Sequence, residues 1–218
     1  EKTKRLMKSV IPKNVDWIKD RVVKVDANAN MVSTHDGSEF TYEYMVLAPG
    51  LVLDPTLIEG LSEALGKGTV CSNYTDPEHT WQVIQNFKGG TALFTQPPKP
   101  YKCGGAPQKI MYLAEERFTK MGVRNETKIV FASASDIIFS VKQIAKTLWG
   151  VINRKGINVR FDHELKKVDA KHQMAWFEAK EDFEEYNALP MEILTKDGLL
   201  GIKYDMLHLV PPNVPPKF

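Results

Sequence analysis

Cysteine is scarce in this chain of 218 residues, which holds only Cys71 and Cys103. Two cysteines are too few for a disulfide scaffold, and neither they nor the five histidines show the spacing of a metal site. No apolar run approaches the roughly 20 residues that a membrane-spanning helix needs. The sequence therefore predicts neither a disulfide-rich module nor a metal centre, and any membrane contact is expected to be peripheral or made by sequence outside the chain.

An excess of charge of one sign is also missing. The 29 basic and 27 acidic residues give a formal net charge of +2, which makes no electrostatic case for binding nucleic acid. The apolar share of 43% and the charged share of 26% are ordinary for a globular protein. A chain of this length is expected to form one large domain or two small ones.

The first part of the chain predicts short antiparallel strands. Alternating and β-branched residues mark strands over 15–25, 31–34 and 40–48, and turn residues separate them. We expect the last of these to be a buried strand that ends at the Ala48-Pro49-Gly50 turn.

From about residue 90 the pattern changes to alternating strands and helices. The expected elements are a strand at 91–95, a helix from 107, a strand at 128–132, a helix at 137–154, a strand at 157–161, short strands near 168 and 175, and a final strand at 204–210. This alternation predicts βαβ units and a parallel sheet, in which ligands bind beyond the carboxyl ends of the strands.

Cys103 follows one of these strand ends, in a proline-bounded loop over 97–106. Lys102 precedes it, two glycines follow it, and Pro107 suits the first turn of the next helix. A nearby helix N-terminus and the lysines Lys102 and Lys109 would lower the thiol pKa and favour the nucleophilic thiolate. The alternative is a buried, inert cysteine, as many cysteines in proteins are.

A glycine-rich nucleotide motif is absent after Val130. That turn contains Ala-Ser-Ala-Ser-Asp over 132–136 in place of G-x-G-x-x-G, so close approach of a pyrophosphate to the backbone is disfavoured. The domain is therefore expected not to bind a nicotinamide dinucleotide. An α/β domain unrelated to dinucleotides is the alternative.

Several segments together resemble the sulfide:quinone oxidoreductases, particularly the eukaryotic mitochondrial type. They are 15–22, 42–50, Ser72-Asn73-Tyr74, the run Lys-Cys-Gly-Gly-Ala-Pro-Gln-Lys-Ile-Met-Tyr-Leu over 102–113, and Met206-Leu207-His208 with the prolines after it. The resemblance implies an α/β flavoprotein fold with two dinucleotide-binding domains, Rossmann-like and disulfide-reductase-like, present as a fragment. Residues 1–60 would belong to the FAD domain and residues 61–203 to a second domain without the NAD glycine motif. Residues 204–218 would be the start of the return of the chain to the FAD domain.

The resemblance also implies an enzyme that oxidises hydrogen sulfide. Cys103 matches the first of the family's two redox cysteines, which carry sulfane sulfur; electrons would pass through FAD to ubiquinone, and the sulfur to glutathione, sulfite or cyanide. Val22 matches a position whose backbone meets the adenine side of FAD, and Ala48 to Gly50 match a turn that passes close to the cofactor. The implied location is the mitochondrial inner membrane, with peripheral or monotopic attachment.

The departures from the family pattern limit these expectations. The amino-terminal FAD glycine motif, the carboxyl-terminal Gly-Asp segment, the second redox cysteine and the apolar terminal helices are absent from the chain, and Cys71 does not match the second cysteine. The chain alone is thus expected neither to hold FAD tightly nor to turn over. Two alternatives stay open: a truncated or degenerate paralogue that acts as a non-catalytic binding or scaffold module, and a type II NADH:quinone oxidoreductase.

Overall fold

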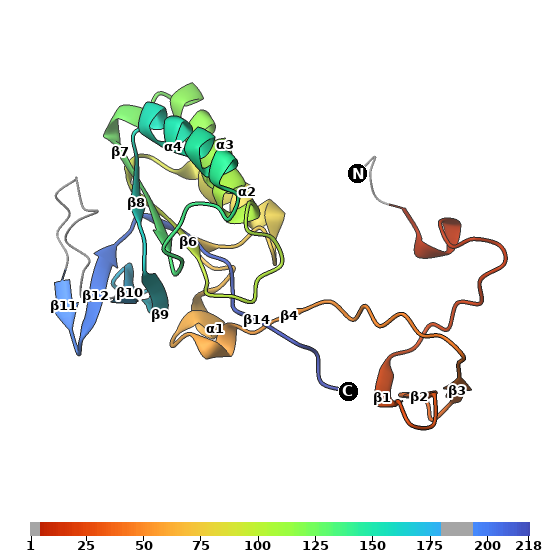
Figure 1. Cartoon of the computed structure of the whole chain (residues 1–218). Coiled ribbons are helices and arrows are strands. Elements are labelled where there is room, and N and C mark those ends of the chain that lie inside the picture. Colours follow the sequence, from red (N-terminus) through yellow and green to blue (C-terminus); the bar gives the residue numbers. More distant parts are fainter. Residues whose placement is uncertain (1–4, 180–193) are drawn as a thin grey trace. The chain divides into compact units, whose positions relative to one another are not determined.

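The computed structural model describes residues 5–179 and 194–218. The chain divides into two compact units (Figure 1). The amino-terminal unit comprises Glu1–Gly50 with Pro215–Phe218, and the α/β unit comprises Leu51–Val214. The boundaries between the two units thus lie after residues 50 and 214. The domain boundaries that the family resemblance implies, after residues 60 and 203, stay predictions.

A small antiparallel meander forms the amino-terminal unit. It follows the short 3-10 helix η1 (Met7–Ser9) and consists of β1 (Val22–Asp26), β2 (Met31–Thr34) and β3 (Glu39–Thr41). The Asp26 carboxylate accepts hydrogen bonds from the backbone N–H groups of Asn28 and Ala29 at 3.1 and 3.0 Å. An aspartate that bonds the backbone two and three residues ahead stabilises a tight turn, and this turn joins β1 to β2.

Two strand predictions in this unit are wrong in extent. Residues 15–21 have no strand structure, and the strand predicted over 40–48 ends at Thr41. The apolar run that follows is exposed, with Tyr44 at 94% and Val46 at 93%. A strand needs a neighbour that takes its backbone hydrogen bonds, and no described strand pairs with 42–48 beyond the single bond from the Tyr42 N–H to the Asn30 carbonyl, so β-propensity alone does not form a strand there.

A five-stranded parallel sheet is the centre of the α/β unit. The strand order is β5–β13–β6–β7–β8, and each pairing is parallel. The strands are β5 (Val70–Cys71), β6 (Gly90–Gln96), β7 (Thr127–Ser133), β8 (Ile157–Arg160) and β13 (Met206–His208). β13 lies in the segment 204–218, which the resemblance assigns to the return of the chain to the FAD domain, yet it is a strand of this sheet.

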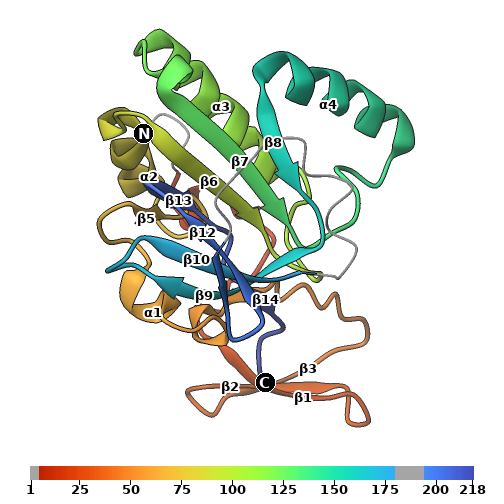
Figure 2. The same ribbon diagram turned by 90° about the vertical axis from the view of Figure 1, so that its left-hand side faces the viewer.

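Three helices cover one face of the sheet (Figure 2). They are α2 (Pro77–Asn86), α3 (Ala106–Lys120) and α4 (Lys142–Lys155), and the 3-10 helix η3 (Arg124–Glu126) precedes β7. The Asp76 side chain caps α2 by accepting from the His79 N–H at 2.9 Å, and Gly156 ends α4 with φ at +59°. These helices pack Ile84, Phe118 and Ile152 onto the sheet.

A second, antiparallel sheet packs on the opposite face. Its order is β11–β12–β10–β9, with β9 (His163–Asp169), β10 (Met174–Ala179), β11 (Leu194–Lys196) and β12 (Leu199–Lys203). The short helices η2 (Pro55–Leu57) and α1 (Leu61–Ala64) precede β5, and β4 (Val52–Leu53) pairs with β14 (Asn213–Val214). Successive residues of each central strand lie alternately in the core beneath the helices and in the core beneath the antiparallel sheet, as Phe94 and Leu93 do. Both faces of these strands are therefore buried, which explains the continuous apolar runs in the sequence.

Two details of the α/β prediction change. The helix predicted from residue 137 begins only at Lys142, because residues 134–141 form bends and the N-cap Val141 is extended. β6, α3 and β7 form a βαβ unit of neighbouring strands ahead of the turn after Val130, so the Cys103 loop is a second strand-to-helix turn that could carry a dinucleotide glycine motif. That loop holds only the pair Gly104-Gly105, without G-x-G-x-x-G spacing.

Candidate functional site

The candidate site lies at the carboxyl edge of the parallel sheet. Because neighbouring strands are parallel, β5, β13 and β6 all end at this edge, at Cys71, His208 and Gln96. The segments that follow these ends are 72–76, 209–212 and the Cys103 loop over 97–105. Open α/β sheets bind ligands at this edge, so these segments are the ones expected to contact a ligand.

Cys103 is an exposed free thiol just before α3. The helix begins at Ala106 with Gly105 as its N-cap, and Pro107 lies in its first turn. The Cys103 side chain therefore lies near the positive end of a helix of 15 residues, in the loop that the sequence predicts. Its exposure excludes the alternative of a buried, inert cysteine.

Cys71 has the opposite environment. It is fully buried in the core between the helices and the sheet, and burial raises the pKa of its thiol to about 12, with a smaller opposing effect of its hydrogen bond to Thr80. A thiol with that pKa is almost entirely protonated at neutral pH. Cys71 is thus a structural residue at the end of β5.

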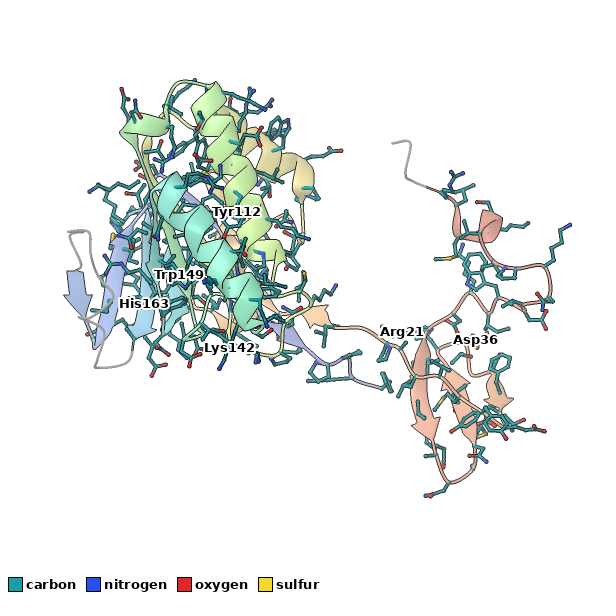
Figure 3. The ribbon with its side chains drawn as sticks, turned by 45° about the horizontal axis from the view of Figure 1, so that its top comes forward. Arg21, Asp36, Tyr112, Lys142, Trp149 and His163 are labelled. Carbon is teal, nitrogen blue, oxygen red and sulfur yellow. The ribbon has the colours of Figure 1, made fainter. Side chains whose placement is uncertain are left out.

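The start of α3 is tied to the connection between β7 and α4. The amide of Gln108, 2% exposed, donates from Nε2 to the carbonyl of Ile138 at 2.6 Å. The hydroxyl of Tyr112, labelled on α3 in Figure 3, donates to Oε1 of Gln108 at 3.2 Å. A buried amide with both ends bonded is costly to move, so the segment next to the Cys103 loop is held in one place.

A cavity of about 330 Å³ lies beside the loop. Its polar lining comes from Gln96, Lys99, Tyr101, Ser135 and Asp136, and Gly104 contributes backbone to its wall. A Cβ on Gly104 would come within 3.3 Å of the Tyr101 ring, so a larger residue there would crowd the loop. The cavity offers one cation and one anion to a small polar molecule next to the Cys103 loop.

Three residues that the sequence reasoning gave no role meet at this edge. His208 is fully buried, and its Nε2 lies 2.7 Å from Oδ1 and 3.2 Å from the backbone nitrogen of Asn73. Tyr74 follows directly, with its N–H donating to the Ser72 hydroxyl at 3.3 Å. Burial raises the pKa of Tyr74, and the charge of Cys103 adds a smaller effect in the same direction. His208 lies inside the strand predicted over 204–210, and Asn73 and Tyr74 follow no predicted strand, so local patterns gave no signal for the three.

The residues predicted to contact FAD lie in the amino-terminal unit. Val22 begins β1 opposite Thr34 and is 37% exposed, while Ala48 and Gly50 lie in an exposed segment without regular structure. A dinucleotide pyrophosphate needs a helix N-terminus and a glycine-rich turn. Within residues 5–50 the unit holds only η1 and the meander, so these residues do not by themselves fit FAD. Cys103 belongs to the other unit.

Among the described residues, no group of three His, Cys, Asp or Glu side chains could hold a metal ion. None of the helices in that part of the chain has both the length and the apolarity to cross a bilayer.

Comparison with known proteins gives curated relatives but no match to a family model. The chain is 41% identical over 211 residues to the mitochondrial sulfide:quinone oxidoreductase of Mus musculus and 37% identical over 211 residues to that of Dictyostelium discoideum. Each alignment covers 95% of the chain, but 44% and 43% of the relatives. The chain thus spans less than half the length of the curated relatives it matches.

Solved structures agree on the fold. The sulfide:quinone oxidoreductase of Aquifex aeolicus matches 94% of the chain with a TM-score of 0.69 at 16% identity, covering 44% of that protein. A ferredoxin reductase from Rhodopseudomonas palustris matches 97% of the chain with a TM-score of 0.59 at 12% identity, covering 45% of that protein. At such identities the likeness shows fold alone, and it confirms the predicted α/β, reductase-like fold as a partial match.

Proposed function

From the membership of this chain in the sulfide:quinone oxidoreductase family, we propose that the protein carrying the chain oxidises hydrogen sulfide. A flavin and a quinone would be the electron acceptors. The observation that carries the proposal is Cys103, an exposed thiol at the start of α3 in the loop with the most specific family likeness. The proposal extends to FAD as the flavin and ubiquinone as the quinone.

Cys103 would act as one of two redox cysteines, the second supplied from outside this chain. Hydrosulfide attacks a sulfur of the disulfide between them; one S–S bond forms as another breaks, leaving a persulfide on one cysteine and a thiolate on the other. A sulfur whose thiolate is stabilised by a helix N-terminus is the better leaving group, and Cys103 lies at such a helix end. The persulfide sulfur would then pass to a small acceptor such as glutathione, sulfite or cyanide.

The residues of this chain have defined tasks in that scheme. Gln108 and Tyr112 hold the start of α3, and the cavity lined by Lys99 and Asp136 gives a small polar sulfur acceptor a place beside the loop. FAD, when bound, would take the two electrons. The described residues do not by themselves fit FAD. The names of the relatives support a mitochondrial location. Peripheral or monotopic attachment to the inner membrane is part of the proposal.

The test is the anaerobic visible spectrum of the purified flavoprotein during addition of sulfide. Bleaching of the flavin, or a long-wavelength charge-transfer band, is expected in the wild type and should vanish in Cys103→Ser. Cys71→Ser is the matched control and should respond as the wild type does. A flavin that ignores sulfide in every variant contradicts the proposal, and absence of bound flavin favours a non-catalytic scaffold.

A further inference from the structure

Two separate segments of the α/β unit form the walls of the cavity beside the Cys103 loop. Lys99, Tyr101 and Gly104 line it from the loop, and residues 135–140 line it from the connection between β7 and α4. Residues 134–141 belong to no helix or strand. The position of this second wall is therefore fixed by contacts outside regular secondary structure.

Gln108 provides the bond that fixes the middle of the second wall. Its amide donates from Nε2 to the carbonyl of Ile138 at 2.6 Å. Within the described part of the chain this is the only hydrogen bond to residues 136–140, because the neighbouring bonds lie at Ala134 and Ser135. The Ile138 side chain is buried in the core beneath the helices, so this residue is held by both its backbone and its side chain.

Gln108 itself has little freedom to move. It is 2% exposed, it lies three residues after the N-cap Gly105, and its Oε1 accepts from the hydroxyl of Tyr112 at 3.2 Å. The two segments also approach each other at Gly105, where an added Cβ would lie 3.9 Å from the Phe139 ring. Breaking a buried amide that is bonded at both ends leaves polar groups unpaired, so the Gln108 bond defines the separation of the two walls.

We propose that Gln108 is a positioning residue, which sets the width of this cavity and so favours a sulfur acceptor large enough to contact both walls. The proposal rests on the proposed function in taking the cavity as the acceptor site beside Cys103. Gln108 takes no part in the bond changes. The acceptor sulfur bonds to the outer sulfur of the persulfide, the S–S bond of the persulfide breaks, and the cysteine leaves as a thiolate.

The two walls carry opposite charges, Lys99 on the loop wall and Asp136 on the other. Glutathione has carboxylates and an ammonium group on one chain, so it can meet both charges at once, and a fixed separation spares it the cost of ordering the walls. Sulfite is a single compact anion and cannot span them. Loss of the Gln108 bond should therefore weaken the binding of glutathione more than that of sulfite.

The experiment compares the KM for glutathione with the KM for sulfite in the purified flavoprotein, with sulfide as the electron donor. Gln108→Leu removes the bond to Ile138 with little change of volume and should raise the ratio of the two KM values about threefold to tenfold, the effect of one lost hydrogen bond. Any change in the reactivity of Cys103 applies to both acceptors and cancels in the ratio. Tyr112→Phe, which leaves Oε1 of Gln108 without its donor, should raise the ratio about twofold.

Binding without turnover provides a second measurement. S-methylglutathione has the shape of the acceptor but no free thiol, and calorimetry should show its Kd raised about threefold to tenfold in Gln108→Leu. Because this titration needs no sulfide, a wild-type flavin that sulfide does not reduce overturns the proposed function, while the Kd still decides the role of Gln108.

Glu115→Gln is the matched control. Glu115 is a buried polar residue two turns further along α3 and does not line the cavity, so its loss should leave the KM ratio and the Kd at the wild-type values. An equal rise in this variant overturns the proposal, because a general loosening of α3 would then be the cause. Wild-type values in Gln108→Leu overturn it directly, and wild-type values in Tyr112→Phe do so if Gln108→Leu does not fold.

Discussion

Asp205 and Thr91 are joined by reciprocal hydrogen bonds across 114 residues of sequence. The Asp205 carboxylate accepts from the Thr91 N–H at 2.7 Å, and the Asp205 N–H donates to the Thr91 carbonyl at 2.9 Å. The pair sets the register of β13 beside β6 at the start of both strands, and so decides which residues arrive together at the other end. His208 and the Cys103 loop reach the same edge because of this register.

Gly90→Ala is expected to destabilise the α/β unit. Gly90 has φ at +95°, and a Cβ there would lie 2.1 Å from the Asp205 carboxylate oxygen, so both the backbone and the hydrogen bond must shift. Backbone strain and the lost bond together predict a loss of about 2–4 kcal/mol in the free energy of unfolding. Urea titration followed by circular dichroism measures it.

Gly66→Ala is the matched control for that substitution. Gly66 also has a positive φ, at +76°, but nothing lies within 4 Å of the added Cβ, so only the strain of about 1–2 kcal/mol applies. Equal losses in the two variants would contradict the role given to Asp205.

Thiol labelling is expected to distinguish the two cysteines without any activity assay. In the folded protein Cys103 should react with a maleimide and Cys71 should not, because burial both blocks Cys71 and raises its pKa to about 12. At neutral pH its thiolate fraction is on the order of one in a hundred thousand. Mass spectrometry should find one label per native chain, none in Cys103→Ser, and two after unfolding. Two labels on the native chain would contradict the assigned burial.

Much of the α/β unit could be predicted because its strands are buried on both faces. Continuous apolar runs such as 91–95 and 128–132, each followed by a helix, leave few arrangements other than a parallel sheet. Cys103 could be placed at a helix start because Pro107 and the glycines act locally. The strand predicted to Ala48 failed for the opposite reason, since strand formation depends on a neighbour that sequence periodicity does not reveal.

The cluster at the sheet edge could not be predicted from local patterns. Asn73 and His208 are 135 residues apart, and only the strand order brings them together. Both the Cys103 loop and the turn after Val130 join a strand to a helix, in the units β6–α3–β7 and β7–α4–β8. Local patterns alone do not say which of the two turns would carry a dinucleotide motif.

Glu115 is expected to be the main ionic link between α3 and the end of α4. Its carboxylate, 9% exposed, pairs with Arg124 at 3.5 Å and with Lys155. Glu115→Gln keeps the shape but leaves two partly buried cations without an anion, and should cost about 1–3 kcal/mol in the free energy of unfolding. The adjacent Glu116→Gln breaks an exposed pair with Lys120 and should cost less than about 0.5 kcal/mol. Similar losses in both would contradict the assignment.

The pH dependence of stability should report the burial of His208. Its pKa is about 3 in the folded state against 6.5 for the free side chain, so between these values the unfolded chain binds the extra proton. The unfolding free energy should therefore be complete above about pH 6.5 and fall as pH drops toward 3, by up to about 1.4 kcal/mol per pH unit. Urea titrations between pH 5 and 7, above the range where most carboxylates titrate, measure the slope.

His208→Gln should lower that slope by up to about 1.4 kcal/mol per pH unit, because the variant lacks the proton that the unfolded chain binds at His208. Some slope should remain, because burial also lowers the pKa of His163, whose protonation therefore destabilises the fold in the same direction. The difference between wild type and variant isolates His208 from all groups common to both. An identical slope would mean that His208 takes up its proton in the folded state, which is incompatible with a neutral ring bonded to Asn73 at the edge of the sheet.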